Sequence, residues 1–191
     1  MVFKDLVLSN RSYRRFVQSE AIPESTLREL VDLARCTPSA ANLQPLRYVL
    51  SSTSERNELV FSTLSWAGYL PDWPGPVEGE RPSAYIVILT DTEISKRVGC
   101  DHGIAAQTIC LGAAEKGYGC CMFGSIDRDA LRRSLAIPER YQILLVIAMG
   151  KPVEKVVIEE VGPDGSIRYY RDSDQVHHVP KRKLEDVLLS P

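Results

Sequence analysis

Two continuous apolar runs constrain the fold of this chain more than any other feature. Residues 84–90 and 142–149 are of strand length and carry little polar content, as is typical of strands that are buried on both faces of a sheet. The longest uninterrupted run, residues 143–149, is far shorter than the roughly 20 residues that cross a bilayer as a helix. We therefore expect two central strands in a soluble domain.

A third apolar segment, residues 101–116, has helical periodicity. Small side chains within it permit close packing, and the residues at helical spacing are Ile104, Ala105, Thr108, Leu111 and Gly112. Gly117 and Gly119 predict its end and the entry to a strand at 120–123. We expect this helix to be either the buried central helix or one that meets its copy in a dimer.

Local signals predict the remaining elements. An opening helix runs to about Ser9, and Pro23 begins a helix whose buried stripe is Leu27, Leu30, Val31 and Ala34. Residues 47–51 form a strand, Ser54 caps a helix to 61, and Asp127 caps a helix to 135. The turn at 162–165 joins residues 156–161 to 167–170 in a β-hairpin. Residues 66–81, rich in proline, glycine and tryptophan, form a long ordered loop that either plugs a core or dimer interface or covers a ligand.

Length and charge restrict the classes of protein that fit. A chain of 191 residues fits one domain, and a net charge of -2 argues against nucleic acid or an anionic membrane surface as the main partner. The N-terminus has no signal-peptide pattern, so we expect a cytoplasmic protein. Glycines 117, 119 and 124 lie where the chain passes from a helix to a strand. A dinucleotide-binding fingerprint requires the order strand, glycine loop, helix, so we exclude it.

The cysteines and histidines indicate neither disulfides nor a metal. Five cysteines are an odd number at irregular spacing, and we expect them to be buried thiols. Cys120 and Cys121 would point to opposite faces of a strand. The pair His177 and His178 and the segment 100–102 have no partner at a recognised metal-binding spacing.

Three polar stretches are candidates for binding. Residues 10–16 hold three arginines around Ser12, which is either a solvated basic loop or a phosphate clamp. Residues 38–45, the proline-bracketed stretch, place small and amide side chains between two prolines, so a stiff backbone leaves polar groups free to meet a flat ligand with polar edges; we favour a flavin. The basic cluster 181–183 is either a solvated tail or part of a site.

Taken in order, these stretches resemble the flavin-dependent nitroreductase family. The family pattern is an arginine-serine stretch, then Pro-Ser-x-x-Asn-x-Gln-Pro, a small-residue helix ending in a glycine turn, and a basic residue near the C-terminus. Here these are residues 11–16, 38–45, 101–124 and 181–183. Asn10 replaces a usual arginine, so the clamp pairs either Arg11 with Arg15 or Ser12 with Arg14. Leu46 stands where tryptophan is common.

The resemblance implies a single domain of α+β fold, with a mostly antiparallel sheet between helices, in an intertwined homodimer with two FMN molecules at the subunit interface. The tail from about residue 152 to 191 would extend onto the partner. The flavin phosphate and pyrimidine edge would be held by Arg11, Ser12, Arg14, Arg15, Lys181 and Lys183. The other subunit would contribute Pro38, Ser39, Ala40, Asn42 and Gln44, and the opposite side would be formed by Met122, Phe123 and Gly124.

The activity that the resemblance implies is an NAD(P)H-dependent flavin oxidoreductase, with NADH and NADPH as alternative co-substrates. Hydride would pass through flavin N5 to an electron-poor acceptor of nitroaromatic, quinone or enone type, without a catalytic side chain. Arg14 or Arg15 would stabilise the negative charge of reduced flavin. The alternatives are a flavoenzyme of oxygen or dehalogenation chemistry and a non-catalytic flavin-binding dimer.

Overall fold

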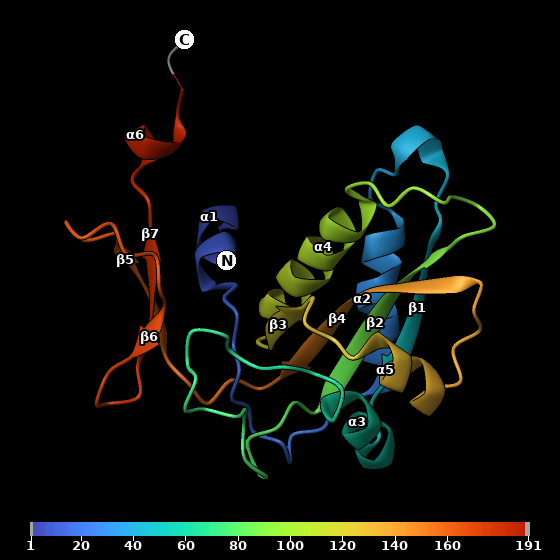
Figure 1. The fold of residues 1–191 in the computed structure, drawn as a ribbon, viewed down its shortest axis with the longest axis horizontal. Helices are drawn as coiled ribbons and strands as arrows, with labels where there is room; N and C mark the ends of the chain where they lie inside the picture. Colours follow the sequence, from blue (N-terminus) through green and yellow to red (C-terminus); the bar gives the residue numbers. More distant parts are fainter. Residues whose placement is uncertain (1, 190–191) are drawn as a thin grey trace.

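A four-stranded antiparallel sheet forms the centre of the molecule (Figure 1). The computed structural model describes residues 2–189. The strands are β1 (Leu46–Ser51), β2 (Ala84–Asp91), β3 (Gly119–Phe123) and β4 (Tyr141–Gly150), in the spatial order β1-β2-β4-β3. Every neighbouring pair is antiparallel. The predicted α+β class and both predicted central strands are confirmed.

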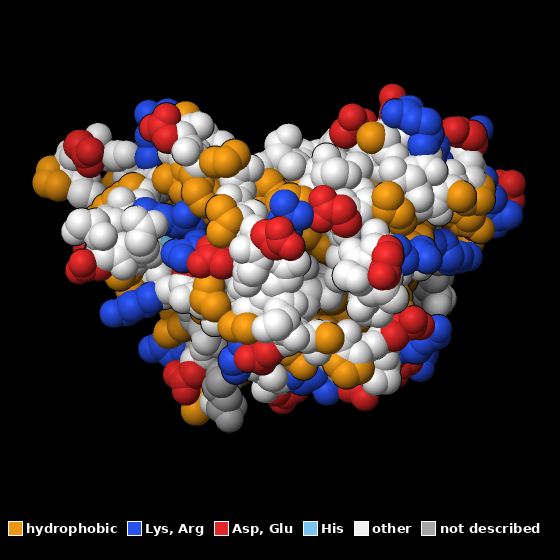
Figure 2. Space-filling model, turned by 90° about the horizontal axis from the view of Figure 1, so that it is seen from below, with side chains coloured by type: hydrophobic (Ala, Val, Ile, Leu, Met, Phe, Trp, Pro, Cys, Tyr) orange, Lys and Arg blue, Asp and Glu red, His pale blue; other side chains and the backbone are white. Residues whose placement is uncertain are grey.

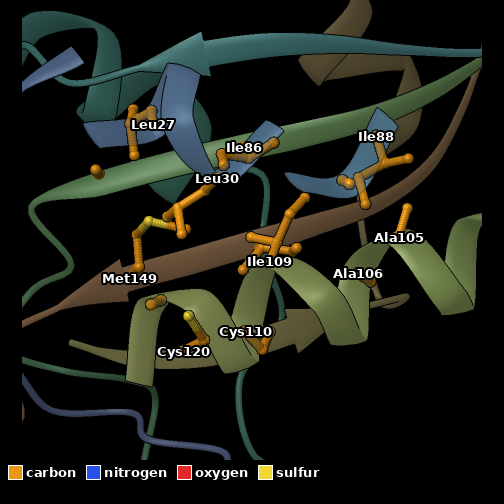
Figure 3. Packing of buried hydrophobic residues seen from close by; sticks show 14 of the residues in the cluster. Leu27, Leu30, Ile86, Ile88, Ala105, Ala106, Ile109, Cys110, Cys120 and Met149 are labelled. Carbon is orange, nitrogen blue, oxygen red and sulfur yellow. The ribbon is translucent and has the colours of Figure 1, made fainter. Parts of the chain in front are cut away.

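Helices α2 (Glu24–Arg35) and α4 (Asp101–Glu115) cover one face of this sheet. Figure 3 shows Leu30 and Ile109 between these helices and the strands, next to Ile86 and Met149. Each of these side chains is almost fully buried, and burial of one such side chain stabilises the fold by about 1.5–3 kcal/mol. α4 is therefore the predicted central helix.

Helices α3 (Ser54–Phe61) and α5 (Arg128–Ser134) cover the opposite face, where Tyr85, Val87 and Val146 are buried. Cys120 packs in the α4 layer and Cys121 in the α3 layer, so the predicted opposite orientation is confirmed. The prediction of buried thiols is correct for Cys110, Cys120 and Cys121. It is wrong for Cys36 and Cys100, which are exposed because they lie at a helix end and in a loop.

Side chains cap the N-termini of α3 and α5. α1 (Phe3–Ser9) ends where predicted, and Asp127 caps α5 by accepting from the Ala130 N–H at 2.9 Å. The expected Ser54 cap is wrong, because Thr53 accepts from the Arg56 N–H and Ser54 is already helical. A short 3-10 helix, Ala40–Asn42, lies inside the proline-bracketed stretch.

A second, three-stranded sheet stands beside the main body, near α1 (Figure 1). Its strands β5 (Val156–Glu160), β6 (Tyr170–Arg171) and β7 (His177–Lys181) have the order β5-β7-β6, and the short helix α6 (Leu184–Val187) follows. The predicted hairpin is wrong, because β7 inserts between its two arms and pairs in parallel with β5. His178 contributes to this order: its ring contacts Glu159 at 2.9 Å on one side and Asp172 at 3.0 Å on the other.

The 66–81 loop contains neither helix nor strand, as predicted, and its side chains contact both sheets. Trp66 packs edge-on against Phe123, with ring centroids 4.6 Å apart, and so fills part of the core. Further along the loop, the Trp73 ring lies 4.2 Å beneath the Arg171 guanidinium, and the Tyr69 ring lies 4.9 Å from Tyr169. The loop therefore holds the C-terminal sheet against the main body.

The surface in Figure 2 mixes positive and negative side chains without a dominant sign, in agreement with the near-balanced net charge. Within residues 2–189, no helix combines the length and the apolar character needed to cross a bilayer.

Candidate functional site

The arginine-rich segment after α1 runs along the edge strand β3. The Tyr13 N–H donates to the Cys120 carbonyl at 2.9 Å, and the buried Phe16 forms a bridge with Pro152. Gly119 makes this close approach possible, because a Cβ there would lie 2.6 Å from both the Tyr13 ring and Pro152. The absence of a side chain at position 119 therefore allows the arginine-rich segment to pack directly against β3.

A cavity of about 360 Å³ opens beside this segment, and we call it the basic cavity. It lies between the segment, α4, β3 and the C-terminal sheet. Its basic side chains are Arg11, Arg14 and Lys181, and no carboxylate lines it. The other lining residues are Asn10, Ser12, Gln107, Cys110, Cys120, Met122, Tyr169, His177 and Val179.

The three cations of this cavity lack acidic partners. Among the residues from 2 to 189, none of Arg11, Arg14 and Lys181 lies within ion-pair distance of a carboxylate. Arg11 donates to the Val7 carbonyl at 2.8 Å, but its buried Nε has no hydrogen-bond partner among the described residues, and burial lowers the pKa of its guanidinium. Buried donors are nearly always satisfied in folded proteins, so the cavity is suited to an anionic ligand.

Arg14 is held in place by neutral groups. Its guanidinium donates to the Ser12 carbonyl at 3.2 Å, meets His177 Nε2 at 3.1 Å and lies 4.7 Å over the Tyr169 ring. Burial, together with the nearby Arg14 and Arg171, lowers the pKa of His177 to about 4. His177 is therefore neutral at pH 7, and because arginine only donates, its Nε2 must accept. These contacts fix the position of the Arg14 guanidinium but do not neutralise its charge.

Arg15, the next residue, has the opposite environment. Its guanidinium binds Glu80 through two bonds of 2.6 Å, which lower the pKa of that carboxyl. Its backbone N–H and that of Arg14 both donate to Glu154, which also pairs with Arg171 at 3.0 Å. Of the two pairings considered for the clamp, Ser12 and Arg14 line one cavity, whereas Arg15 lies outside it.

The other predicted residues near β3 and the tail are divided by strand alternation and charge pairing. Met122 lines the basic cavity, whereas Phe123 faces the other side of the sheet beneath Trp66. Gly124 is exposed, and its carbonyl accepts from Arg128 at 3.2 Å. Lys183 lies 3.6 Å from Glu160 and outside the cavity, unlike Lys181.

The proline-bracketed stretch lies at the N-terminal end of α4 and does not line the basic cavity of its own chain. The Ser39 hydroxyl donates to Asp101 at 2.6 Å, and the Ala40 N–H donates to the same carboxylate at 3.1 Å. Pro38, Ser39 and Gln44 line a separate cavity of about 160 Å³. The stretch is thus fixed to α4 by one acidic residue.

The backbone of this stretch is strained. Ala41, Asn42 and Gln44 have φ values of 49°, 55° and 52°, in the left-handed region that side chains rarely adopt. Such conformations persist only where surrounding contacts enforce them, and they are concentrated at functional sites. Ser39 supplies one such contact, because its hydroxyl accepts from the Gln44 N–H at 2.9 Å.

Sequence reasoning did not place Tyr169, Gln107 or His177 in this site. His177 attracted notice only as a possible metal ligand, and no group of His, Cys, Asp or Glu side chains between residues 2 and 189 could hold a metal ion. Tyr169 and His177 reach the cavity through the C-terminal sheet, whose strand order was not apparent from local sequence.

Comparisons with known proteins identify the same fold and show which residues the family match covers. A family model described as the nitroreductase family matches residues 7–73 and 81–151. A relative from Methanothermobacter thermautotrophicus, named "Putative NADH dehydrogenase/NAD(P)H nitroreductase", is 27% identical over 157 residues, which cover 78% of this chain and 77% of the relative. The family match ends before the C-terminal sheet.

Solved structures share the fold. A nitroreductase family protein from Clostridium novyi NT has a TM-score of 0.67 at 22% identity, covering 80% of this chain and 86% of that protein. A structure from Exiguobacterium sibiricum 255-15, described as "a putative nitroreductase in complex with FMN", has a TM-score of 0.65 at 18% identity, covering 80% and 89%.

Proposed function

The chain belongs to the nitroreductase family of oxidoreductases, and from this membership we propose that it is an FMN-dependent NAD(P)H oxidoreductase with an electron-poor acceptor. The acceptor class is a nitroaromatic, quinone or enone. One observation carries the proposal: the basic cavity gathers Arg11, Arg14 and Lys181 without a carboxylate among its lining residues. A phosphate-bearing cofactor supplies the missing negative charge.

The residues of the basic cavity fit FMN. A phosphate monoester carries close to two negative charges at pH 7 and several strong acceptor oxygens, and the partnerless Arg11 Nε is a donor for one of them. Arg11, Lys181 and the Ser12 hydroxyl would hold the phosphate and the pyrimidine edge. When bound, FMN supplies the two-electron hydride chemistry, so the protein has only to bind, orient and stabilise charge.

Arg14 is the residue that we assign to charge stabilisation. It lines the cavity and has no acidic partner in the described part of the chain, whereas Arg15 is neutralised by Glu80. A preorganised cation lowers the free energy of a ligand that becomes more negative on reduction. His177 and Tyr169 hold the guanidinium in place without neutralising it.

The second half of the site is proposed to come from another copy of the chain. Ala40, Asn42 and Gln44 are exposed on a strained stretch that does not reach the basic cavity of its own chain. In a homodimer, Pro38, Ser39, Ala40, Asn42 and Gln44 would approach the ring held by the partner's arginines. FMN binding should then require the dimer, and a stable monomer that kept its FMN would contradict this arrangement.

Anaerobic addition of NADH or NADPH to the purified protein tests the proposal. We expect a yellow preparation whose flavin absorbance near 450 nm falls on addition of the nucleotide and returns on addition of a quinone such as menadione. A colourless protein that takes up no FMN would overturn the proposal. FMN that binds but is not reduced would point to the non-catalytic alternative, and reoxidation by oxygen alone would point to oxygen chemistry.

A further inference from the structure

A second cavity, of about 300 Å³, lies on the opposite face of the central sheet. Its lining comes from α3, from the start of β2 and from the end of the 66–81 loop. Tyr85 on its wall belongs to the buried layer under α3, whereas Cys120 of the basic cavity belongs to the α4 layer. We call it the polar cavity, and the sheet separates it from the proposed cofactor site.

Several residues that line this cavity carry buried polar atoms without partners. In the part of the chain from residue 2 to 189, eight buried side-chain nitrogen or oxygen atoms lack a hydrogen-bond partner. Three of them, Arg81 Nε, Ser83 Oγ and Tyr85 Oη, belong to residues that line this cavity. Ser83 is 5% exposed and Tyr85 is 0% exposed. A cluster of this kind requires an explanation, because native proteins leave few buried polar groups unpaired.

Two of the neighbouring polar side chains, Asn57 and Gln18, already use their oxygen atoms as acceptors and do not satisfy these three atoms. The Asn57 amide donates to the Ser83 carbonyl at 2.7 Å, and its oxygen accepts from Ser51 at 2.8 Å. The side-chain oxygen Oε1 of Gln18 accepts from the backbone N–H groups of Gly79 and Arg81.

The charge of the polar cavity is balanced. Arg81 donates to Glu58 at 2.6 Å, and its guanidinium lies 4.3 Å over the Phe61 ring. Glu58 therefore neutralises the charge of Arg81, whereas the Nε–H of Arg81 stays available as a neutral-pair donor. The cations of the basic cavity differ, because no described residue neutralises their charges. Burial and the nearby Glu58 raise the pKa of Tyr85, so its hydroxyl keeps its proton. The negative charge of Glu58 would repel an anionic ligand, whereas it would not repel an uncharged oxygen acceptor.

We propose that the polar cavity binds a small uncharged molecule that presents carbonyl or hydroxyl oxygens to Arg81 Nε, Ser83 and Tyr85. The volume is at the lower end of the range for small-molecule pockets, about 300–1,000 Å³. Glu58 and Ala21 are exposed at its margin and leave it open to solvent. Ordered water alone is the competing occupant of a polar cavity.

Two probes of the same shape test the charge requirement. Acetamide and acetate are added separately to the ¹⁵N-labelled full chain at constant ionic strength, with glycerol as a polyol probe. We expect acetamide and glycerol to shift the amide signals of Asn57, Ser83 and Tyr85 in a saturable way, and acetate to leave them unchanged. The readout does not involve flavin, so it is independent of the proposed function.

Matched variants test the residues. Tyr85→Phe should weaken acetamide binding about tenfold, as expected for the loss of one buried hydrogen bond, and Ser83→Ala gives a second measurement if the first variant folds poorly. Tyr48→Phe, on the neighbouring strand and outside this cavity, should bind as the unchanged protein does.

Three results would overturn the proposal. The first is the absence of saturable shifts with both acetamide and glycerol, which would leave water as the occupant. The second is equal binding of acetate. The third is unchanged acetamide affinity in both Tyr85→Phe and Ser83→Ala.

Discussion

The basic cavity and the proline-bracketed stretch carry the strongest binding signals in the chain, yet they are built in opposite ways. The basic cavity joins segments far apart in sequence, and no acidic side chain within residues 2–189 pairs with Arg11, Arg14 or Lys181. The stretch is formed by neighbouring residues, and Asp101 already satisfies Ser39 and Ala40. The basic cavity carries positive charge that only a ligand would neutralise. The backbone of the proline-bracketed stretch, in contrast, is fixed by contacts within the chain and needs no ligand. We therefore expect charge changes to affect the first and backbone changes to affect the second.

The largest effect is expected from removing two cations. Arg11→Ala combined with Arg14→Ala should weaken FMN binding by about 10²-fold or more, because each charge-assisted hydrogen bond contributes about 1.5–3 kcal/mol. Quenching of FMN fluorescence in a titration measures the affinity. Arg15→Ala is the matched control and should change it less than about threefold, since Arg15 binds Glu80. Equal losses in both proteins would remove the distinction between Arg14 and Arg15.

The next effect is steric. Gly119→Ala should lower the free energy of unfolding by about 2–3 kcal/mol, as is typical of overpacking, because the added Cβ would lie 2.6 Å from Tyr13 and Pro152. Displacement of Tyr13 should also weaken FMN binding. Urea denaturation and the FMN titration measure the two effects. In Gly103→Ala the new methyl group meets no atom within 4 Å, and a comparable loss in that control would contradict the explanation.

The third prediction concerns pH. The pKa of His177 is about 4 in the folded protein and 6.5 ordinarily, so its contribution to stability is complete above pH 6.5 and is lost as the pH falls towards 4. Between pH 6.5 and 5 the loss should be about 1.5 kcal/mol. Urea denaturation at these pH values, compared with His177→Gln, isolates this contribution.

His178 provides the opposite case and a control. Asp172 and Glu159 raise the pKa of His178, so its contribution is complete below pH 6.5 and is lost as the pH rises through the folded-state value. His178→Gln should therefore remove a fall in stability as the pH rises above 6.5 and should change the slope below pH 6.5 little, whereas His177→Gln should flatten the loss at low pH. The same slope in both variants would contradict the assignment.

The smallest effect should appear in the stretch. Asp101→Asn should cost about 1 kcal/mol of stability and speed amide hydrogen exchange at residues 39–44, because Ser39 and Ala40 lose a charged acceptor. It should weaken FMN and riboflavin binding equally, since riboflavin lacks the phosphate, whereas the double arginine variant should abolish the preference for FMN. Asp32→Asn on the exposed face of α2 is the control. A selective loss of FMN in Asp101→Asn would show that the two regions are not separate.

Sequence patterns predicted the elements whose signals are local. The apolar runs identified β2 and β4, and Asp127 marked the start of α5. The start of α3 was misplaced by one residue because Thr53 and Ser54 are both good caps. The C-terminal strand order could not be predicted, since a turn signal at 162–165 outweighs the contacts of His178 with Glu159 on β5 and with Asp172 just after β6.

The arginine segment shows the same limit within the site. Sequence marked Arg11, Arg14 and Arg15 alike, but Glu80, 65 residues away, decides which of them is neutralised. Side chains alternate along β3, so Met122 and Phe123 face opposite sides of the sheet. This alternation was predicted for Cys120 and Cys121, whereas Met122 and Phe123 were both predicted to contact the flavin. The composition of a site can be recognised locally, whereas its charge state depends on long-range partners.

The 66–81 loop has a practical consequence for spectroscopy. Both tryptophans of the chain lie in it, Trp66 against Phe123 and Trp73 beneath Arg171. Intrinsic fluorescence therefore observes the junction between the two sheets and is blind to much of the α4 layer. An emission change during denaturation would report the release of Trp73 from Arg171 or of Trp66 from Phe123, and circular dichroism is needed to follow the central helices. An emission transition at lower denaturant concentration than the loss of helix would show that the junction between the two sheets opens before the main body unfolds.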